Sequence, residues 1–243
     1  MKIILNSKKI NLNINSDPID INYLLKKIKE KNNVIAYKIN EKIFDLKSII
    51  SIKKNDEIVL ICKDDETAKD IYNHSTAHLL AHSIHRLYPK ADFAIGPSIE
   101  NGFYYDIDFK DHVLSENDFA KIENEMHKIV NEKIEIKKKI ISKEEAIKLF
   151  KDNKYKLELI NEINDNISVY TQKDFTDLCT GPHVPNTSYL KYFKILSLSG
   201  SYWRGNSKNK QLTRIYGTAN SNEEKLKEFL ELLKKRKKSI IKK

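Results

Sequence analysis

The sequence is poor in cysteine and lacks a long apolar run. Its 243 residues include two cysteines, Cys62 and Cys179, so no disulfide framework is available and a reducing, cytoplasmic compartment is expected. No stretch approaches the roughly 18 apolar residues of a transmembrane helix, and we therefore expect no membrane partner. The opening MKIILNSKKINLNIN is too polar around its short apolar patch to predict a signal peptide.

Arginine is also scarce, with four residues against 40 lysines, and the formal net charge is +10. Residues 1–62 carry 12 basic and 7 acidic side chains, residues 63–220 carry 23 of each, and residues 221–243 carry 9 and 4. The excess therefore lies at the two ends, where it would attract a phosphate backbone. The alternative is that a lysine-rich composition, which suits an AT-rich genome, merely keeps the protein soluble.

The first 62 residues predict a small β-grasp domain. Apolar alternation predicts two short strands over 2–14, and a helical stripe predicts a helix over 19–28. The apolar segments VIAYKIN, EKIFDL and DEIVLICK then predict further strands. The charged stretch KDDETAKD that follows marks the boundary of this domain.

Residues 63–220 predict a larger α+β domain, so the fold class of the chain is α+β. A long helix is expected from about residue 66 to 88, because Pro89 ends it. Asn101-Gly102 between apolar segments is a strong hairpin signal.

Two capping patterns and a charged tail predict the remaining helices. Ser115 and Ser142 are each followed three residues later by an acidic side chain, the pattern of a helix start. Residues 221–243 combine leucines on one broad face with many lysines and predict a basic linker helix.

Histidines recur at helical spacing in HSTAHLLAH, residues 74–82. His74 and His78 stand at i and i+4, so they project from one helix face, and His82 extends the row. Helical histidine pairs serve as zinc ligands. A single histidine pair at this spacing more often consists of polar surface residues or of hydrogen-bonded core residues.

A second group of candidate ligands lies in CTGPH, residues 179–183. Gly181 and Pro182 interrupt any regular helix, so this segment is expected to be a rigid loop that presents Cys179 and His183. Together with the histidine pair they match the donor set of a zinc site. Taken alone, Cys179 is more often a small buried hydrophobe.

Three further side chains are candidates. Tyr104 and Tyr105 follow the Asn-Gly turn, and strand alternation places one of them in the core and the other away from it. Asp177 is suited to orient a histidine or to bind a substrate amine, with a plain turn residue as the alternative. Lys156 lies in YKLELI, where a solvated lysine is the alternative.

Three long phrases closely resemble the editing domain of bacterial threonyl-tRNA synthetases: HSTAHLLAHSIHRLYPKADFAIGPSIENGFYYDID, DLCTGPHVPN and GSYWRGNSKNKQLTRIYGTA. Residues 1–62 are similar to the TGS domain that precedes it in those enzymes. Alanyl-tRNA editing domains and their free-standing relatives share the HxxxH and CxxxH patterns. They lack the N-terminal unit and the run from SYWRG to RIYGTA.

The resemblance implies hydrolysis of the ester in seryl-tRNA(Thr), which releases serine and tRNA. Serine and threonine differ by one methyl group, worth about 1–3 kcal/mol in a binding pocket, so a second, hydrolytic site restores fidelity. The partners implied are tRNA(Thr) charged with serine and a synthetase domain, in cis or in trans. Alternatives are a free-standing trans-editing deacylase and a non-catalytic tRNA-binding module.

The resemblance also implies roles for the candidate residues. Lys156 and His74 are expected to position or activate the water and the terminal ribose hydroxyl. The substrate-binding residues would be Tyr104 and Asp177, of which Asp177 reads the amine or hydroxyl of the substrate. The remaining catalytic candidates, which would complete and shape the pocket, are His78, Cys179 and His183.

On cofactors, the resemblance implies that the threonyl branch edits without metal, whereas the alanyl branch keeps zinc. We therefore expect no cofactor for editing, with the alternative of zinc held by His74, His78, Cys179 and His183. ATP and a further zinc would belong to the synthetase domain. The sequence contains no class II ATP-binding motif, so this chain is not expected to charge tRNA by itself.

Overall fold

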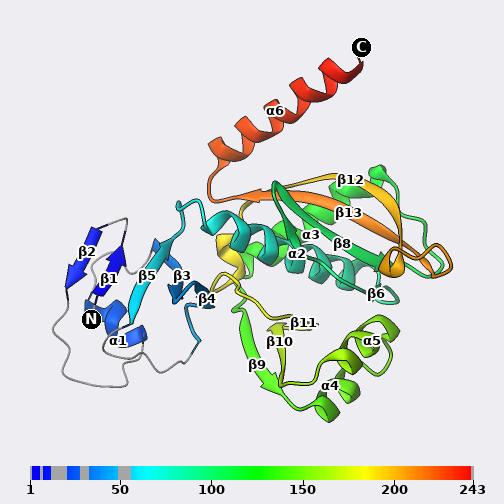
Figure 1. Ribbon diagram of the computed structural model, residues 1–243. Coiled ribbons are helices and arrows are strands. Elements are labelled where there is room, and N and C mark those ends of the chain that lie inside the picture. Colours follow the sequence, from blue (N-terminus) through cyan, green and yellow to red (C-terminus); the bar gives the residue numbers. More distant parts are fainter. Residues whose placement is uncertain (1, 6–7, 12–20, 28–32, 49–55, 242–243) are drawn as a thin grey trace.

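The computed structural model describes residues 2–5, 8–11, 21–27, 33–48 and 56–241 (Figure 1). The part of the predicted strand pattern that falls in residues 12–14, and the ends of the helix predicted over 19–28, lie outside the described residues. The described residues are of mixed helix and strand, so the α+β prediction is confirmed.

The N-terminal part forms a five-stranded mixed sheet with strand order β2-β1-β5-β3-β4. Strands β1 and β5 pair in parallel and the other neighbours pair antiparallel, which is the β-grasp arrangement expected from the sequence. Its core is formed by buried apolar side chains such as Ile3, Leu24, Tyr37 and Ile58. The elements are β1 (Lys2–Leu5), β2 (Lys8–Asn11), α1 (Ile21–Lys27), β3 (Val34–Ile39), β4 (Lys42–Asp45) and β5 (Glu57–Cys62).

The long helix α2 (Ala68–Leu87) forms the centre of the larger domain. It is buried along most of its length because it packs between helix α3 on one side and strands β8 and β13 on the other (Figure 1). The sheet has strand order β12-β13-β8-β6, and β7 pairs with β8. The elements are β6 (Asp92–Phe93), β7 (Ser98–Ile99), β8 (Gly102–Asp108), α3 (Phe119–Asn131), β12 (Tyr192–Tyr202) and β13 (Gln211–Asn220).

A smaller lobe is inserted between α3 and β12. Its three-stranded sheet, in the order β11-β10-β9, covers a separate apolar core that includes Ile141, Phe150 and Ile160. In Figure 1 this lobe lies below α2. The elements are β9 (Lys137–Ile141), α4 (Lys143–Leu149), α5 (Lys154–Glu162), β10 (Ile167–Gln172) and β11 (Phe175–Leu178).

Both predicted capping patterns are present. The Ser142 side chain accepts the Glu145 N–H and begins α4. The Ser115 box begins a 3-10 turn, Glu116–Asp118, which continues into α3. Single 3-10 turns also occur at Thr187–Tyr189 and Trp203–Gly205.

The final helix, α6 (Glu223–Ile241), projects from the end of β13 away from the rest of the molecule (Figure 1). Its Leu226 is buried against the larger domain. Among the described helices, none combines the length and the apolar character that crossing a membrane requires.

Candidate active site

The two predicted ligand groups meet in space. His74 and His78 project from one face of α2, and the loop after β11 presents Cys179 and His183 against them. The Cys179 Sγ lies 3.2 Å from His74 Nε2 and 3.3 Å from His183 Nε2. One ligand atom from each of the four residues lies within 4.8 Å of the others. We call these four residues the His/Cys cluster.

The loop of the cluster has a conformation that requires glycine. Gly181 adopts a φ of +79°, and a Cβ at this position would stand 1.9 Å from the Tyr170 hydroxyl oxygen. Its N–H points back to the Cys179 Sγ at 3.2 Å. The Cys179 N–H in turn donates to the Ser168 carbonyl at 3.1 Å. The position of the Cys179 thiol is therefore fixed by the hydrogen bond of its own backbone N–H and by the N–H of Gly181.

The orientation of the His183 ring is determined by α2. Ser75 Oγ lies 3.2 Å from His183 Nδ1 and accepts the Val184 N–H at 3.0 Å. With Nδ1 engaged there, Nε2 is the nitrogen that faces the thiol. Ser75 was not among the predicted site residues, because a serine beside a histidine in a helix does not by itself indicate a functional role.

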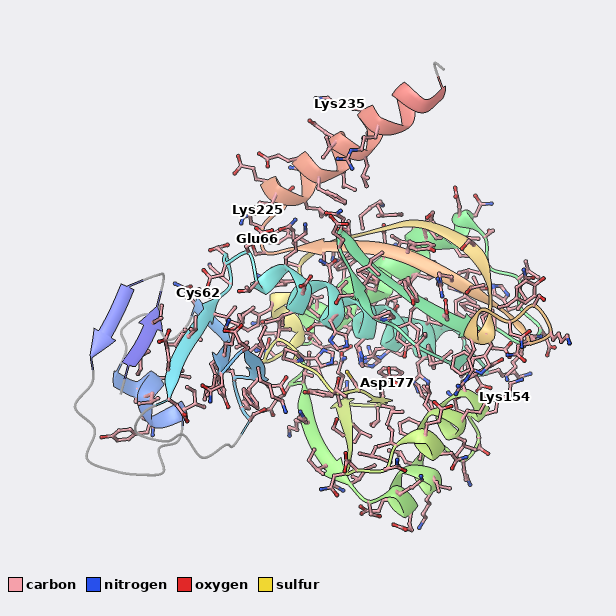
Figure 2. The ribbon with its side chains drawn as sticks, viewed as in Figure 1. Cys62, Glu66, Lys154, Asp177, Lys225 and Lys235 are labelled. Atoms are coloured by element: carbon pink, nitrogen blue, oxygen red, sulfur yellow. The ribbon has the colours of Figure 1, made fainter. Side chains whose placement is uncertain are left out.

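Lys156, Asp177 and Tyr105 form a second group beside the cluster. The Lys156 ammonium lies 2.5 Å from Asp177 Oδ1, and the Tyr105 hydroxyl donates to Asp177 Oδ2. His78 Nδ1 lies 3.7 Å from the same Oδ2 and so connects the two groups. All four side chains are buried. Figure 2 shows Asp177 where the smaller lobe meets the layer of α2.

The prediction of Tyr104 as the substrate-binding tyrosine needs correction, because the structure places Tyr105 in the site. The Tyr104 ring lies on the opposite face of β8, 3.8 Å from the Arg214 guanidinium carbon. The Tyr105 ring fills the space that Gly96 leaves free. The alternation of Phe103, Tyr105 and Ile107 in one apolar row was the signal for the inward face.

His82, the third histidine of the row, does not belong to the cluster. Its Nε2 lies 3.0 Å from Asp174 Oδ1, and its ring stacks on Phe175. It is fully buried, so it acts as a hydrogen-bonded core residue.

A cleft of about 590 Å³ opens beside the two groups. His74, Lys156 and Asp177 border it on one side, and apolar side chains such as Ile95 and Leu159 border it elsewhere. We call this space the main cleft. The cleft therefore offers a small ligand both hydrogen-bonding groups and an apolar wall.

Burial keeps most of the cluster uncharged at neutral pH. Loss of solvent lowers the pKa values of His74 and His183, and lowers that of His78 to about 3. Burial also raises the pKa of the Cys179 thiol to about 12, so it is protonated. The imidazoles are consequently neutral at this pH.

Asp177 behaves differently from these neighbours. Burial opposes ionisation of its carboxyl group, yet the Lys156 charge, the nearby His78 and the hydrogen bonds from Lys156 and Tyr105 lower its pKa below the ordinary value. The site thus contains one ammonium–carboxylate pair among neutral groups.

The His/Cys cluster also fits Zn²⁺ in chemistry. Three imidazoles and one thiol, with ligand atoms 3.2 and 3.3 Å apart, suit a tetrahedral zinc ion. Four protein donors would close such a site, whereas catalytic zinc sites keep a position for water. A zinc held by all four residues would therefore be structural.

Comparisons with known proteins show what this chain is similar to. Residues 167–216, from β10 to β13, match the family model described as the threonyl and alanyl tRNA synthetase second additional domain. A threonine–tRNA ligase of Thermotoga maritima is 50% identical over 198 residues, which are 80% of this chain and 31% of that protein. The ligase of Petrotoga mobilis is 53% identical over 208 residues, 84% of this chain and 32% of that protein.

A threonine–tRNA ligase of Staphylococcus aureus is 46% identical over 209 residues, which are 85% of this chain and 32% of that protein. The chain spans about a third of the length of the curated relatives that it matches. Asp177, Cys179 and His183 all lie within the residues that match the family model. The chain is therefore similar to threonine–tRNA ligases over four-fifths of its length, and its residues 167–216 match the second additional domain of the threonyl and alanyl tRNA synthetases.

Proposed function

We propose that the chain is the N-terminal editing region of a threonine–tRNA ligase and that it hydrolyses seryl-tRNA(Thr) to free serine and tRNA. The observation that carries this proposal is the convergence of the His/Cys cluster and the Lys156–Asp177 pair on one cleft. The similarity to threonine–tRNA ligases favours tRNA(Thr) over other tRNAs. The synthetase domain would act in cis or in trans.

The reaction is the addition of water to the ester carbonyl. The carbonyl carbon gains the water oxygen, the bond to the ribose oxygen breaks, and a proton passes to the departing ribose oxygen, which becomes a hydroxyl. His74, a neutral imidazole at the mouth of the cleft, is placed to take the proton from water. The Lys156 ammonium is placed to donate to the oxygens that gain charge.

His78 and Cys179 are poor candidates for the same role. A histidine whose pKa is about 3 retains a proton too weakly to serve as the base at neutral pH. A thiol whose pKa is about 12 is a poor nucleophile, so an acyl-cysteine intermediate is disfavoured. These side chains, with His183, would instead shape the pocket and hold the water.

Asp177 would recognise the substrate amine while it holds Lys156 in place. Its carboxylate borders the main cleft and already accepts from Lys156 and Tyr105. An ammonium group on the substrate would add a second positive charge to the one carboxylate. The apolar wall of the cleft would exclude the extra methyl group of threonine.

The proposed mechanism needs no cofactor. If zinc were bound by fewer than four of His74, His78, Cys179 and His183, the ion would supply a Lewis acid or a bound hydroxide. With four protein ligands it would lack an open position for water. Hydrolysis in the presence of a chelator separates these two cases.

The test compares tRNA(Thr) charged with serine and tRNA(Thr) charged with threonine, each with and without a chelator. We expect rapid release of serine, slow release of threonine, and no effect of the chelator. Equal release of both amino acids would contradict the proposed size discrimination. Loss of serine release in the chelator would show that the site depends on a metal and would contradict the cofactor-free mechanism.

Two alternatives predict different results. A free-standing trans-editing deacylase would show the same hydrolysis, and the reading frame downstream of the gene would reveal whether a synthetase domain follows. A non-catalytic tRNA-binding module would bind tRNA in a salt-dependent manner but release no serine. The assembled cleft favours the catalytic proposal over this module.

A further inference from the structure

One buried carboxylate of the N-terminal sheet contacts His183 of the His/Cys cluster. Asp45 is the last residue of β4 and is 9% exposed. Its Oδ1 accepts the His183 N–H at 2.6 Å, and its Oδ2 accepts the Tyr170 hydroxyl at 2.6 Å. Hydrogen bonds to a carboxylate are about twice as strong as neutral ones.

A third donor to Asp45, the Ser48 hydroxyl, lies 3.3 Å from Oδ2, but it is the His183 N–H and Tyr170 that determine the geometry of the cluster loop. The Tyr170 ring packs against the His183 ring with centroids 4.4 Å apart. The Tyr170 hydroxyl also stands where a Cβ of Gly181 would be. One carboxylate thus fixes the backbone of His183 and the aromatic ring that supports its imidazole.

The N-terminal sheet is docked firmly enough to hold Asp45 in place. Ile35, Ala36 and Ile61 are buried in the same hydrophobic cluster as α2 and β8. Lys47 forms an ion pair with Glu135, just before β9. The position of Asp45 is consequently determined by contacts on both sides of the boundary.

Asp45 does not border the main cleft. It lines a second cavity of about 520 Å³, together with Tyr170, Lys138 and His183. An effect of Asp45 on the reaction must therefore pass through His183 and its loop.

We propose that Asp45 is a positioning residue, through which the N-terminal sheet completes the site of the larger domain. The proposal rests on the proposed function for its catalytic consequence. The same claim also predicts a change in the loop that can be measured without catalysis. Its evidence is the pair of 2.6 Å hydrogen bonds that join β4 to His183 of the loop and to Tyr170 of β10.

The experiment compares the full chain with its Asp45→Ala, Asp45→Asn and Lys47→Met variants. Asparagine keeps an oxygen acceptor for the His183 N–H. Lys47→Met is the matched control, because it removes a charge from the same interface but touches no residue of the loop. Two readouts are taken: steady-state deacylation of seryl-tRNA(Thr), and the rate at which iodoacetamide alkylates Cys179, assigned by peptide mass spectrometry.

For Asp45→Ala, which removes both of these hydrogen bonds, we expect kcat to fall by at least about tenfold, the value of one lost buried hydrogen bond, with little change in KM. The same variant should alkylate faster at Cys179. Asp45→Asn should recover most of both readouts, and Lys47→Met should match the wild type. Wild-type values for a folded Asp45→Ala variant would overturn the proposal, as would an equal loss in Lys47→Met.

If Asp45→Ala does not fold by circular dichroism, Tyr170→Phe replaces it, since this change removes one of the two bonds. An intermediate loss supports the proposal, and wild-type values overturn it. If the wild-type chain releases no serine, the proposed function fails, but the alkylation rates still decide whether Asp45 positions the loop.

Discussion

The buried pair Lys156–Asp177 yields the sharpest prediction about the site. Both side chains are almost completely buried, at 3% and 2% exposure, and the ammonium lies 2.5 Å from the carboxylate. At an effective dielectric constant of about 20 the attraction is roughly 6 to 7 kcal/mol. This attraction offsets a desolvation penalty of several kcal/mol for each ion.

The perturbation is Lys156→Met, which keeps the length of the side chain and removes its charge. Asp177 then remains buried with neutral donors only, the Tyr105 hydroxyl and the Leu178 N–H. An uncompensated buried charge destabilises a protein by about 3–5 kcal/mol. The double variant with Asp177→Asn removes both charges, so it should lose less free energy of unfolding than Lys156→Met alone.

The assay is urea unfolding at pH 7, followed by circular dichroism. The matched control is Lys194→Met, because Lys194 pairs with Glu123 at 2.7 Å but is 48% exposed. Exposed pairs contribute about 0–1 kcal/mol. A loss in Lys156→Met no larger than in Lys194→Met would refute the reasoning. So would a double variant whose loss equals the sum of the two single losses.

Three other predictions follow from the site. His78 has a folded pKa near 3 against about 6.5 unfolded, so the folded state binds fewer protons and the free energy of unfolding falls as pH drops below 6.5. At pH 5 this loss of free energy of unfolding is about 2 kcal/mol. The urea midpoints at pH 7 and pH 5 should therefore differ less in His78→Asn than in the wild type. An equal difference in the two proteins would contradict the low pKa of His78. Tyr105→Phe should slow serine release about tenfold, whereas Tyr104→Phe should not, and equal rates would argue against Tyr105. Alkylation of Cys179 should still accelerate between pH 9 and pH 10, because its pKa is about 12; a plateau there would contradict the buried, protonated thiol.

Periodicity was sufficient to predict the parts of the site that lie within one element. The i and i+4 spacing placed His74 and His78 on one helix face, and the Gly181-Pro182 pair indicated a loop that presents Cys179 and His183. Local alternation also predicted strands in the N-terminal domain. These features depend on neighbours in the sequence, so the sequence alone predicts them.

Contacts between distant segments were harder to predict. The choice between Tyr104 and Tyr105 required knowing which face of β8 meets α2, although the apolar row through Phe103 indicated it. Asp45 lies 138 positions before His183 in the sequence, and no pattern in KIFD distinguishes it from an exposed acidic residue. Such a role depends on how two sheets pack and is visible only in three dimensions.

The central claim is that a helix face and a loop assemble a hydrolytic site. Its most direct test is single-turnover release of serine from seryl-tRNA(Thr) by the wild-type chain and by His74→Asn. The account predicts rapid release by the wild type and a large loss of rate in the variant, with tRNA binding retained. Release by His74→Asn at the wild-type rate, or no release by either protein, would contradict it.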